Sequence, residues 1–328
     1  MSTYPSDQRR HSEDIAAAEP RVVVAELVPE FSWQRIPDQP LRPRRIVLPL
    51  VLFVATCLST LWAGWIEAVR GADLDAMALG NLLRFGLVEG LKYAVPLMTI
   101  LVFHEMGHFL QARRYGIPAS LPYFIPMPIS PIGTFGAVIS MSARMGHRRA
   151  LFDIGITGPL AGLFPTLVFC VLGLQWSEAV PAKAAPDGTA VGVPLVFSYL
   201  AEAVGPSRSP GDIIVLHPMA FAGWVGLLIT SINLFPIGQL DGGHVLYALL
   251  RERAGAVASL LLVVAMVAVL WYRLFGWMLM LLLLIMMGPK HPPTADDDEP
   301  LGLVRHLLGW ATLAMMPLGF TPTPFLIE

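Results

Sequence analysis

Residues 101–110 carry three side chains that could do chemistry inside an otherwise apolar run. They contain His104, Glu105 and His108 in the pattern His-Glu-x-x-His. On an α-helix, residues four positions apart lie on one face, so the two imidazoles would project side by side. Two imidazoles in this arrangement can bind one zinc ion, and the neighbouring carboxylate is then a candidate general base. Because ionisable residues within an apolar span usually mark a functional site, we predict a catalytic zinc site here.

A third ligand must come from another part of the chain, because a catalytic zinc ion usually has three protein ligands and one position for water. The best candidate is Asp241, which lies beside a predicted membrane span and next to glycines that allow close approach. Basic residues at the ends of the spans place it at the same depth as His104 and His108. The alternative interpretation is that Asp241 only caps a helix that starts at Gly243.

The expected chemistry is hydrolysis of a peptide bond. Zinc lowers the pKa of a bound water molecule enough to supply hydroxide at neutral pH. Glu105 would take the proton from that water and pass it to the leaving amine. Asn233 is a candidate for an oxyanion or substrate contact, because its amide can donate a hydrogen bond. A polar contact between two helices is an equally good interpretation of Asn233.

The composition of the whole chain indicates a membrane protein. Of its 328 residues, 55% are hydrophobic and 14% are charged, whereas soluble domains carry roughly 25% charged residues. The net charge of −2 gives no indication of nucleic-acid binding. Cys57 and Cys170 both lie in apolar runs, so we expect no disulfide framework.

The apolar runs predict an all-α polytopic membrane protein with six or seven transmembrane helices. Arginines at positions 42, 44 and 45 precede the first run, which places the N-terminus in the cytoplasm by the positive-inside rule. The polar residues 67–89 are expected to form an interfacial helix, and residues 301–320 either a seventh span or a helix on the membrane surface. Six spans of sufficient length are predicted at residues 46–65, 91–111, 156–174, 215–235, 256–271 and 274–287.

Residues 117–149 do not have a helical pattern, because five prolines interrupt them. Residues 133–141 follow with the alternation that is typical of a β-strand. Non-helical backbone at membrane depth occurs only where protein buries it or where it lines a wet cavity. We therefore predict a re-entrant β-hairpin or strand near the active site; a surface loop in the cytoplasm is the alternative.

These features divide the chain into three parts. Residues 1–43 are polar and rich in proline, and we expect a disordered cytoplasmic tail. Residues 44–290 would form the transmembrane core, and residues 291–328 an acidic, solvated linker followed by an apolar helix. The tail has neither the apolar core of a signal peptide nor the acid-poor composition of a transit peptide. The expected location is therefore the inner (cytoplasmic) membrane of a bacterium.

Together these motifs resemble those of the site-2 protease family of intramembrane zinc metalloproteases. The resemblance rests on residues 104–108 (His-Glu-Met-Gly-His), 233–236 (Asn-Leu-Phe-Pro) and 240–243 (Leu-Asp-Gly-Gly), and residues 133–136 and 158–162 resemble segments of one branch of that family. It implies cleavage of the transmembrane segment of a protein substrate. It also implies three zinc ligands, one catalytic acid/base and one substrate or oxyanion contact, which would be His104, His108 and Asp241, then Glu105, then Asn233.

Two further segments bear on packing and on substrate selection. Gly158 and Gly162 in the third predicted span have a spacing that lets helices approach closely. We interpret that pattern as packing, with no chemical role. Residues 176–212, expected as an extracytoplasmic loop, are far too short for the PDZ domain that many family members carry. The resemblance is therefore to a branch without that domain.

Two other functions are compatible with a zinc site in a membrane protein. A metal transporter would spread ionisable residues through several spans, whereas here they gather at one depth. An inactive scaffold would keep the fold without the chemistry, and the intact Glu105 argues against it. The expected partners are the lipid bilayer and a transmembrane protein or peptide substrate, with no nucleic acid. No feature of the sequence sets an oligomeric state.

Overall fold

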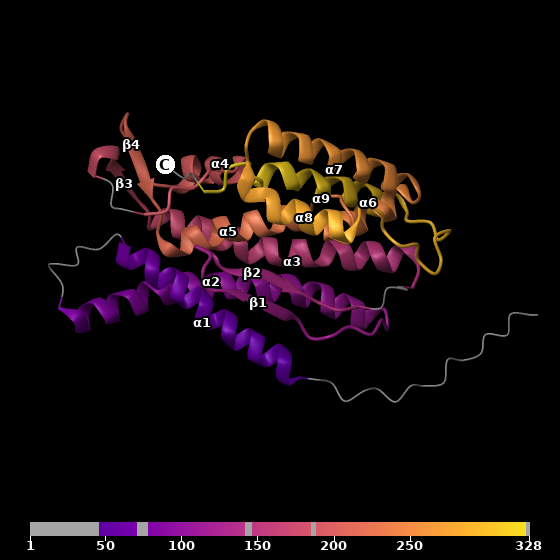
Figure 1. Ribbon diagram of the computed structural model, residues 1–328, viewed down its shortest axis with the longest axis horizontal. Coiled ribbons are helices and arrows are strands. Elements are labelled where there is room, and N and C mark those ends of the chain that lie inside the picture. The colour runs from indigo at the N-terminus through magenta and orange to yellow at the C-terminus, as the bar shows by residue number, and fades with distance from the viewer. Residues whose placement is uncertain (1–45, 71–77, 142–145, 185–187, 326–328) are drawn as a thin grey trace, which may run out of the picture. The chain divides into compact units, whose positions relative to one another are not determined.

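The computed structural model describes residues 46–70, 78–141, 146–184 and 188–325, which belong to one compact unit, Arg45–Glu328 (Figure 1). The predicted tail, residues 1–43, lies outside the described residues. In the compact unit, α3 (Arg148–Gln175) is the central helix. It packs against α2 (Leu79–Arg114), α5 (Pro218–Asn233) and α6 (Asp241–Leu250).

Within the described residues, four helices are long and apolar enough to cross a membrane: α1 (Val47–Arg70), α2, α3 and α7 (Arg253–Trp271). Two other predicted spans form the shorter helices α5 and α8 (Met278–Met287), which have 16 and 10 residues. Both are shorter than the roughly 20 residues that cross a bilayer core. The chain is mostly helical, as predicted, but six or seven transmembrane helices are not confirmed.

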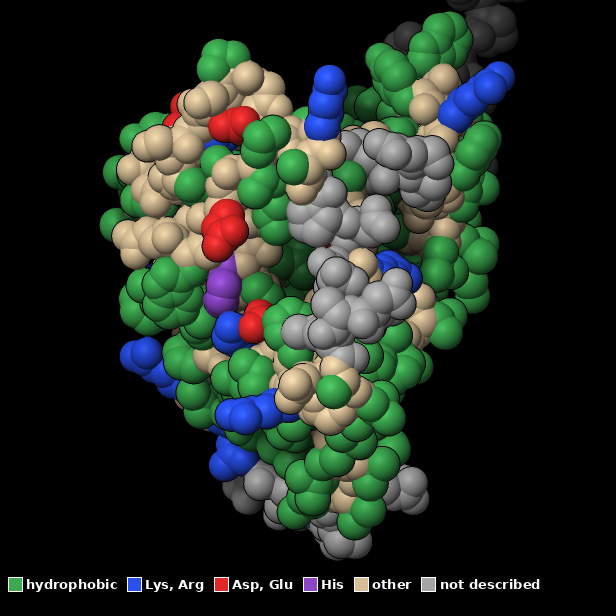
Figure 2. Space-filling model, turned by 90° about the vertical axis from the view of Figure 1, so that its left-hand side faces the viewer, with side chains coloured by type: hydrophobic (Ala, Val, Ile, Leu, Met, Phe, Trp, Pro, Cys, Tyr) green, Lys and Arg blue, Asp and Glu red, His purple; other side chains and the backbone are tan. Residues whose placement is uncertain are grey.

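The outward faces of the helices are apolar, as a bilayer environment requires. On α1, the exposed fractions of Val47, Leu50 and Leu58 are 74%, 58% and 62%. On α8, Met286 is 75% exposed. Hydrophobic side chains also occupy much of the face shown in Figure 2. Contiguous apolar surface of this extent is unusual in soluble monomers and fits contact with lipid.

Of the segment 67–89, predicted as an interfacial helix, residues 67–70 end α1 and residues 71–77 lie outside the described residues. Residues 79–89 are helical and continue without a break into the second predicted span, so that α2 has 36 residues. Residues 79–90 of α2 pack against α1 and leave no room for side chains at Gly86 and Gly90. A Cβ at Gly86 would lie 2.1 Å from the indole Nε1 of Trp65, and one at Gly90 would lie 2.8 Å from the carbonyl oxygen of Leu61.

The predicted strand region forms a small antiparallel hairpin of β1 (Tyr123–Met127) and β2 (Gly133–Val138). The strand ends at Val138 rather than at residue 141. Gly133 has a φ of 81° at the turn, a conformation that favours glycine. Ser59 of α1 donates a hydrogen bond to the Gly133 carbonyl at 2.6 Å, and Tyr93 of α2 donates one to the Ile132 carbonyl at 2.7 Å. The hairpin is thus attached to both helices.

The expected loop 176–212 contains structure that the sequence did not predict. Strands β3 (Glu178–Pro181) and β4 (Asp212–Val215) form a second antiparallel pair, with α4 (Leu195–Val204) between them in sequence. Glu67 of α1 accepts hydrogen bonds from the backbone amide and the hydroxyl of Thr189, at 2.6 and 2.8 Å. These bonds connect α1 to the segment between β3 and α4.

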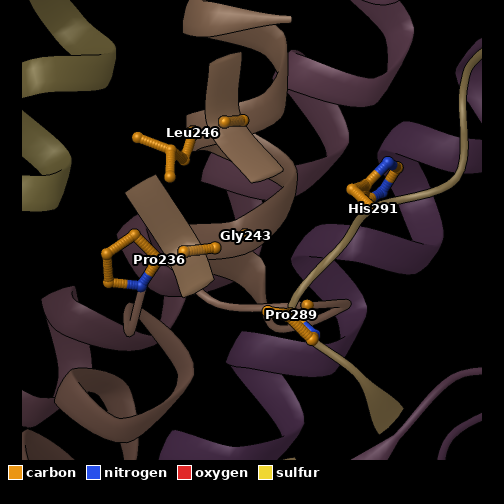
Figure 3. A pocket seen from close by; sticks show the side chains of 8 residues that line it. Pro236, Gly243, Leu246, Pro289 and His291 are labelled. Atoms are coloured by element: carbon orange, nitrogen blue, oxygen red, sulfur yellow. The ribbon is translucent and has the colours of Figure 1, made fainter. Parts of the chain in front are cut away.

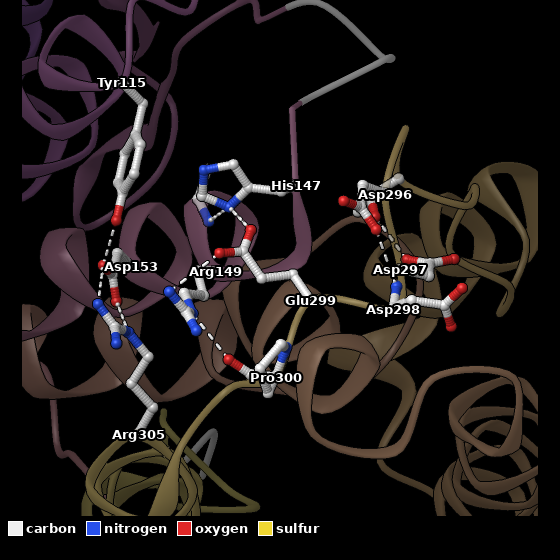
Figure 4. A network of polar contacts seen from close by, with 12 residues as sticks. Tyr115, His147, Arg149, Asp153, Asp296, Asp297, Asp298, Glu299, Pro300 and Arg305 are labelled. Atoms are coloured by element: carbon white, nitrogen blue, oxygen red, sulfur yellow. Dashed lines mark hydrogen bonds and ion pairs between the residues drawn. The ribbon is translucent and has the colours of Figure 1, made fainter.

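The acidic segment before α9 (Leu303–Gly319) is bonded to the rest of the unit, as Figure 4 shows. Glu299 is half-buried and forms ion pairs with His147 at 2.8 Å and Arg149 at 2.9 Å. One helical turn into α3, Asp153 binds Arg305 of α9 through two contacts of 2.8 and 2.9 Å. Tyr115, at the end of α2, donates to the same carboxylate. The segment is therefore an attached connection, although Asp296 and Asp298 are exposed as expected of a solvated linker.

Candidate metal centre

The structure brings His104, His108 and Asp241 together, although Asp241 lies more than 130 residues from the histidines in sequence. The two imidazoles project from one face of α2, with their Nε2 atoms 3.3 Å apart. Asp241 occupies the first position of α6 and places Oδ2 3.1 Å from His104 Nε2 and Oδ1 3.2 Å from His108 Nε2. Among the described residues, this is the cluster whose donor atoms could hold a metal ion.

The donor set fits zinc in both chemistry and spacing. Zinc binds imidazole nitrogen and carboxylate oxygen at about 2.0–2.2 Å, so donor atoms at neighbouring corners of a tetrahedron lie about 3.3 Å apart. The 3.1 Å from His104 Nε2 to Asp241 Oδ2 and the 3.3 Å between the two Nε2 atoms lie near that value, and one donor atom from each of the three residues lies within 4.8 Å of the other two. His104 and His108 are 3% and 4% exposed. Three protein donors leave one tetrahedral position for water, as in catalytic zinc sites.

The segment after α5 brings the Asp241 carboxylate to the histidines. The helix ends at Asn233, and Gly238 in the connection to α6 has a φ of 60°, a conformation that favours glycine. A Cβ at Gly242 would lie 2.0 Å from the carbonyl oxygen of Leu234, so only glycine fits beside Asp241. The capping alternative does not describe this helix start, because the N-cap of α6 is Leu240 and no side chain caps it.

A backbone carbonyl of α3 orients the His108 ring. The Nδ1 atom of His108 lies 2.7 Å from the carbonyl oxygen of Ile154. A carbonyl only accepts, so Nδ1 carries a proton, and Nε2 is the ring atom that faces Asp241 and His104. Thr157 donates to the same carbonyl at 3.0 Å. Metal-binding histidines are commonly held in this way, because the second hydrogen bond fixes both tautomer and ring orientation.

Asn233 and Glu105 complete the polar groups at the cluster. The amide nitrogen of Asn233 lies 3.3 Å from His104 Nε2, so this side chain faces the donor atoms. Glu105 is 4% exposed and follows His104 on α2. Within the part of the chain that the structure describes, Glu105 pairs with no lysine or arginine.

Glycines on α3 face the two histidines, a role that the sequence interpretation missed. A Cβ at Gly158 would lie 1.9 Å from His108 Nε2, and one at Gly162 would lie 3.0 Å from the His104 Cβ. A Cβ at Gly107 of α2 would lie 2.5 Å from the Thr157 carbonyl oxygen. The available signal was the matched spacing: two glycines four apart on one helix face two histidines four apart on another.

His244 does not belong to the donor cluster. Its Nδ1 lies 2.7 Å from Nε2 of His291, and its Cβ packs near Gly155 of α3. His291 lines a small cavity beside the start of α6, together with Pro236, Gly243 and Leu246 (Figure 3). Burial lowers the pKa of His291 from its ordinary value. This histidine pair therefore packs α6 against the segment that follows α8.

Comparison with known proteins gives consistent matches to metalloproteases. The family model of peptidase family M50 matches residues 92–274, more than half of the chain. Probable zinc metalloprotease EGY1, chloroplastic, of Oryza sativa subsp. japonica is 34% identical over 217 residues, which cover 61% of this chain and 37% of that protein. Probable zinc metalloprotease EGY2, chloroplastic, of Arabidopsis thaliana is 32% identical over 226 residues, which cover 65% of this chain and 38% of that protein.

The matched regions are limited in extent. This chain covers less than two fifths of the length of these two relatives. No solved structure matches the chain. The M50 match includes both histidines of the cluster and Asp241, because residues 92–274 contain all three.

Proposed function

The chain belongs to peptidase family M50, the family of the site-2 proteases that its motifs resemble, and we propose that it is an intramembrane zinc metalloprotease. Its substrates would be membrane proteins, cleaved in or near their transmembrane segments. One observation carries the proposal: two helices place one donor atom each of His104, His108 and Asp241 within 4.8 Å of one another, next to a buried carboxylate, that of Glu105, which forms an ion pair with no lysine or arginine among the described residues. A metal transporter or an inactive scaffold has no need of a free Glu105 at that position.

The roles of the residues follow from their positions. Zinc held by His104, His108 and Asp241 would activate a water molecule and polarise the scissile carbonyl. Glu105 accepts the proton of the attacking water and delivers it to the leaving amine. The Asn233 amide donates a hydrogen bond to the substrate carbonyl oxygen or to the oxyanion that develops from it. The Ile154 carbonyl keeps the proton of His108 on Nδ1, away from the donor cluster.

The proposed setting is a multi-pass protein in an inner (cytoplasmic) membrane with a cytoplasmic N-terminus. Six or seven helices would cross or enter the bilayer, since the short helices α5 and α8 pack with the longer ones. We also propose that α9 belongs to this membrane-embedded bundle. Arg305, near the start of α9, binds Asp153 of α3. At the other end of α9, a Cβ added at Gly319 would lie 2.5 Å from the hydroxyl of Ser231 of α5, so the two helices pack closely there. Residues 44–290 would be the protease core.

A substrate helix must be unwound before its carbonyls can be attacked, because they are hydrogen-bonded within the helix. Strand β2 offers an edge for the unwound segment. It pairs on one side with β1 and with no other described strand. Val138 at its end is 53% exposed. Addition of an extended peptide to such an edge is a common mode of peptide recognition.

The proposal is tested with purified wild-type protein and Glu105→Gln. We expect both to bind one zinc ion per chain, since the ligands are unchanged, and only the wild type to cleave a synthetic transmembrane peptide. Glu89→Gln is a matched control, because it makes the same change on α2 at a residue that pairs with Lys92. It should cleave as the wild type does. Zinc in all three proteins without cleavage of several such peptides would favour a transporter or a scaffold.

A further inference from the structure

Thr230 of α5 has a hydroxyl group that is buried and unpaired. Among the described residues, its Oγ1 is the buried side-chain oxygen or nitrogen without a hydrogen-bond partner. The residue is 5% exposed. Leaving a buried hydroxyl unpaired costs about 1–3 kcal/mol, so native proteins rarely do so without a reason.

The hydroxyl of Thr230 is also oriented differently from other helical hydroxyls in this protein. A threonine or serine within a helix commonly donates to the carbonyl four residues earlier. Among the described residues, those within helices that make this bond, at 2.7–2.8 Å, are Thr56, Thr60, Thr99, Thr166, Ser259 and Thr312. Thr230 does not use the equivalent carbonyl, that of Gly226. Its hydroxyl therefore has a different use.

The packing of α2, α3 and α5 indicates that Thr230 lies in the same layer of the interface as His104. A Cβ at Gly226 of α5 would lie 2.9 Å from Ile100 of α2 and 2.8 Å from Thr166 of α3. Thr230 lies one helical turn beyond Gly226, and His104 lies one turn beyond Ile100, on helices that run in the same direction. On α3, which runs the other way, Gly162 lies one turn before Thr166 and packs against His104.

His104 has an unused donor in this layer. All its polar contacts among the described residues, to Asp241, His108 and Asn233, involve Nε2. Within the described part of the chain its Nδ1 makes no hydrogen bond, whereas Nδ1 of His108 donates to the Ile154 carbonyl. Metal-binding histidines almost always donate their second N–H to an oxygen atom. The two ligands thus differ in the one contact that sets their tautomer.

We propose that the Thr230 hydroxyl accepts the Nδ1 proton of His104, directly or through one buried water molecule. Thr230 is then a positioning residue for this ligand. The contact favours the tautomer in which Nε2 carries no proton and faces the donor cluster. It also limits rotation of the ring. This inference rests on the proposed zinc site, and it assigns to α5 a second contribution beyond Asn233.

The test measures zinc affinity, which does not depend on finding a substrate. Thr230→Val replaces the hydroxyl with a methyl group of the same size, and Thr230→Ser keeps the hydroxyl. A competing chelator gives the zinc dissociation constant of each purified full-length protein. We expect Val to weaken zinc binding by roughly 10- to 100-fold, the range for lost second contacts of metal-binding histidines. Serine should restore the wild-type affinity.

Thr312→Val is the matched control, because Thr312 is 1% exposed but already donates to the Leu308 carbonyl at 2.8 Å. It should leave zinc affinity unchanged. Thr230→Ala provides a second variant if valine does not fit. Wild-type affinity in either folded variant, Val or Ala, would overturn the role of Thr230 and leave the zinc protease intact. Absence of zinc from the wild type would overturn the metal centre, and this role with it.

Discussion

Replacing Gly158 with alanine should abolish zinc binding while the fold persists. The added Cβ would lie 1.9 Å from Nε2 of His108, the atom that faces the other donors, and 2.3 Å from two other atoms of the ring. Because ordinary contact distances begin at 3.4 Å, the new Cβ and His108 Nε2 would have to move apart by about 1.5 Å. Zinc–ligand distances tolerate deviations of only about 0.2 Å.

Neither way of making that room preserves the site. Moving the ring breaks the 2.7 Å hydrogen bond from Nδ1 to the Ile154 carbonyl, which holds its orientation. Moving α3 away from α2 by 1.5 Å also carries the carbonyl away, and it opens the close contact between Gly107 and Thr157. Overpacking of this kind costs typically 1–3 kcal/mol of stability, so the chain should still fold.

The assay is zinc content per chain after dialysis against a weak chelator, with helix content and thermal unfolding measured in parallel. Gly162→Ala is a graded comparison on the same helix, because its Cβ would lie 3.0 Å from His104 and needs a shift of only a few tenths of an ångström. It should weaken zinc binding without removing it. Gly276→Ala, with no atom within 4 Å of the new Cβ, should bind as the wild type does. A folded Gly158→Ala protein with wild-type zinc affinity would refute His108 Nε2 as a ligand in this geometry.

Three further predictions test the strand edge and the connection at the start of α9. Val138→Pro should lower peptide cleavage at unchanged zinc content, because proline removes a backbone N–H from β2 and disturbs the strand that would pair with the substrate. Equal cleavage would exclude that strand as the substrate site. Arg305→Met should lower the free energy of unfolding by about 1 kcal/mol, since it leaves the Asp153 carboxylate without its cation in a half-exposed pair; an unchanged unfolding temperature would show that solvent screens the pair. Burial alone would raise the pKa of Asp297, but hydrogen bonds from a threonine and from Tyr247 outweigh it and lower the pKa below 3.8. A carboxyl whose pKa is lower in the folded state stabilises the fold at pH values above its ordinary pKa, and this stability is lost as the pH falls through the pKa of the folded state. The free energy of unfolding of Asp297→Asn should therefore depend less on pH below 3.8 than that of the wild type.

The sequence was sufficient to predict the parts of the site that depend on helix geometry. His104 and His108 face one way because residues four apart on a helix must do so. Asp241 could be placed at their depth because basic residues mark the ends of apolar runs. The structure brings these three residues together and places Asn233 within 3.3 Å of His104. Each of these inferences used a periodicity or a charge that the side chains themselves display.

The remaining parts depend on contacts that leave no pattern in one segment alone. The acceptor that orients His108 is a backbone carbonyl, and every residue has one, so Ile154 could not be distinguished in advance. The merging of residues 79–90 into α2 depends on glycines that meet Trp65 and Leu61 of another helix. The β3–β4 pair depends on two short segments that lie far apart in sequence. In each case the partner of a segment, rather than its own composition, determined the outcome.

The glycines opposite the histidines show why metal ligation and helix packing are one requirement in this fold. Two imidazole rings in the α2–α3 interface occupy the volume that side chains of α3 would otherwise fill. Nε2 of His108 lies where a Cβ of Gly158 would be, with only 1.9 Å between the two positions. A Cβ of Gly162 would lie 3.0 Å from the Cβ and 3.2 Å from the Nδ1 of His104, so this glycine gives up less volume to its histidine. A glycine pair that only packed helices would tolerate alanine equally at both positions, at the cost of a small separation. The expected difference between Gly158→Ala and Gly162→Ala therefore separates the two explanations: unequal loss of zinc supports ligation across the interface, and equal loss supports packing alone.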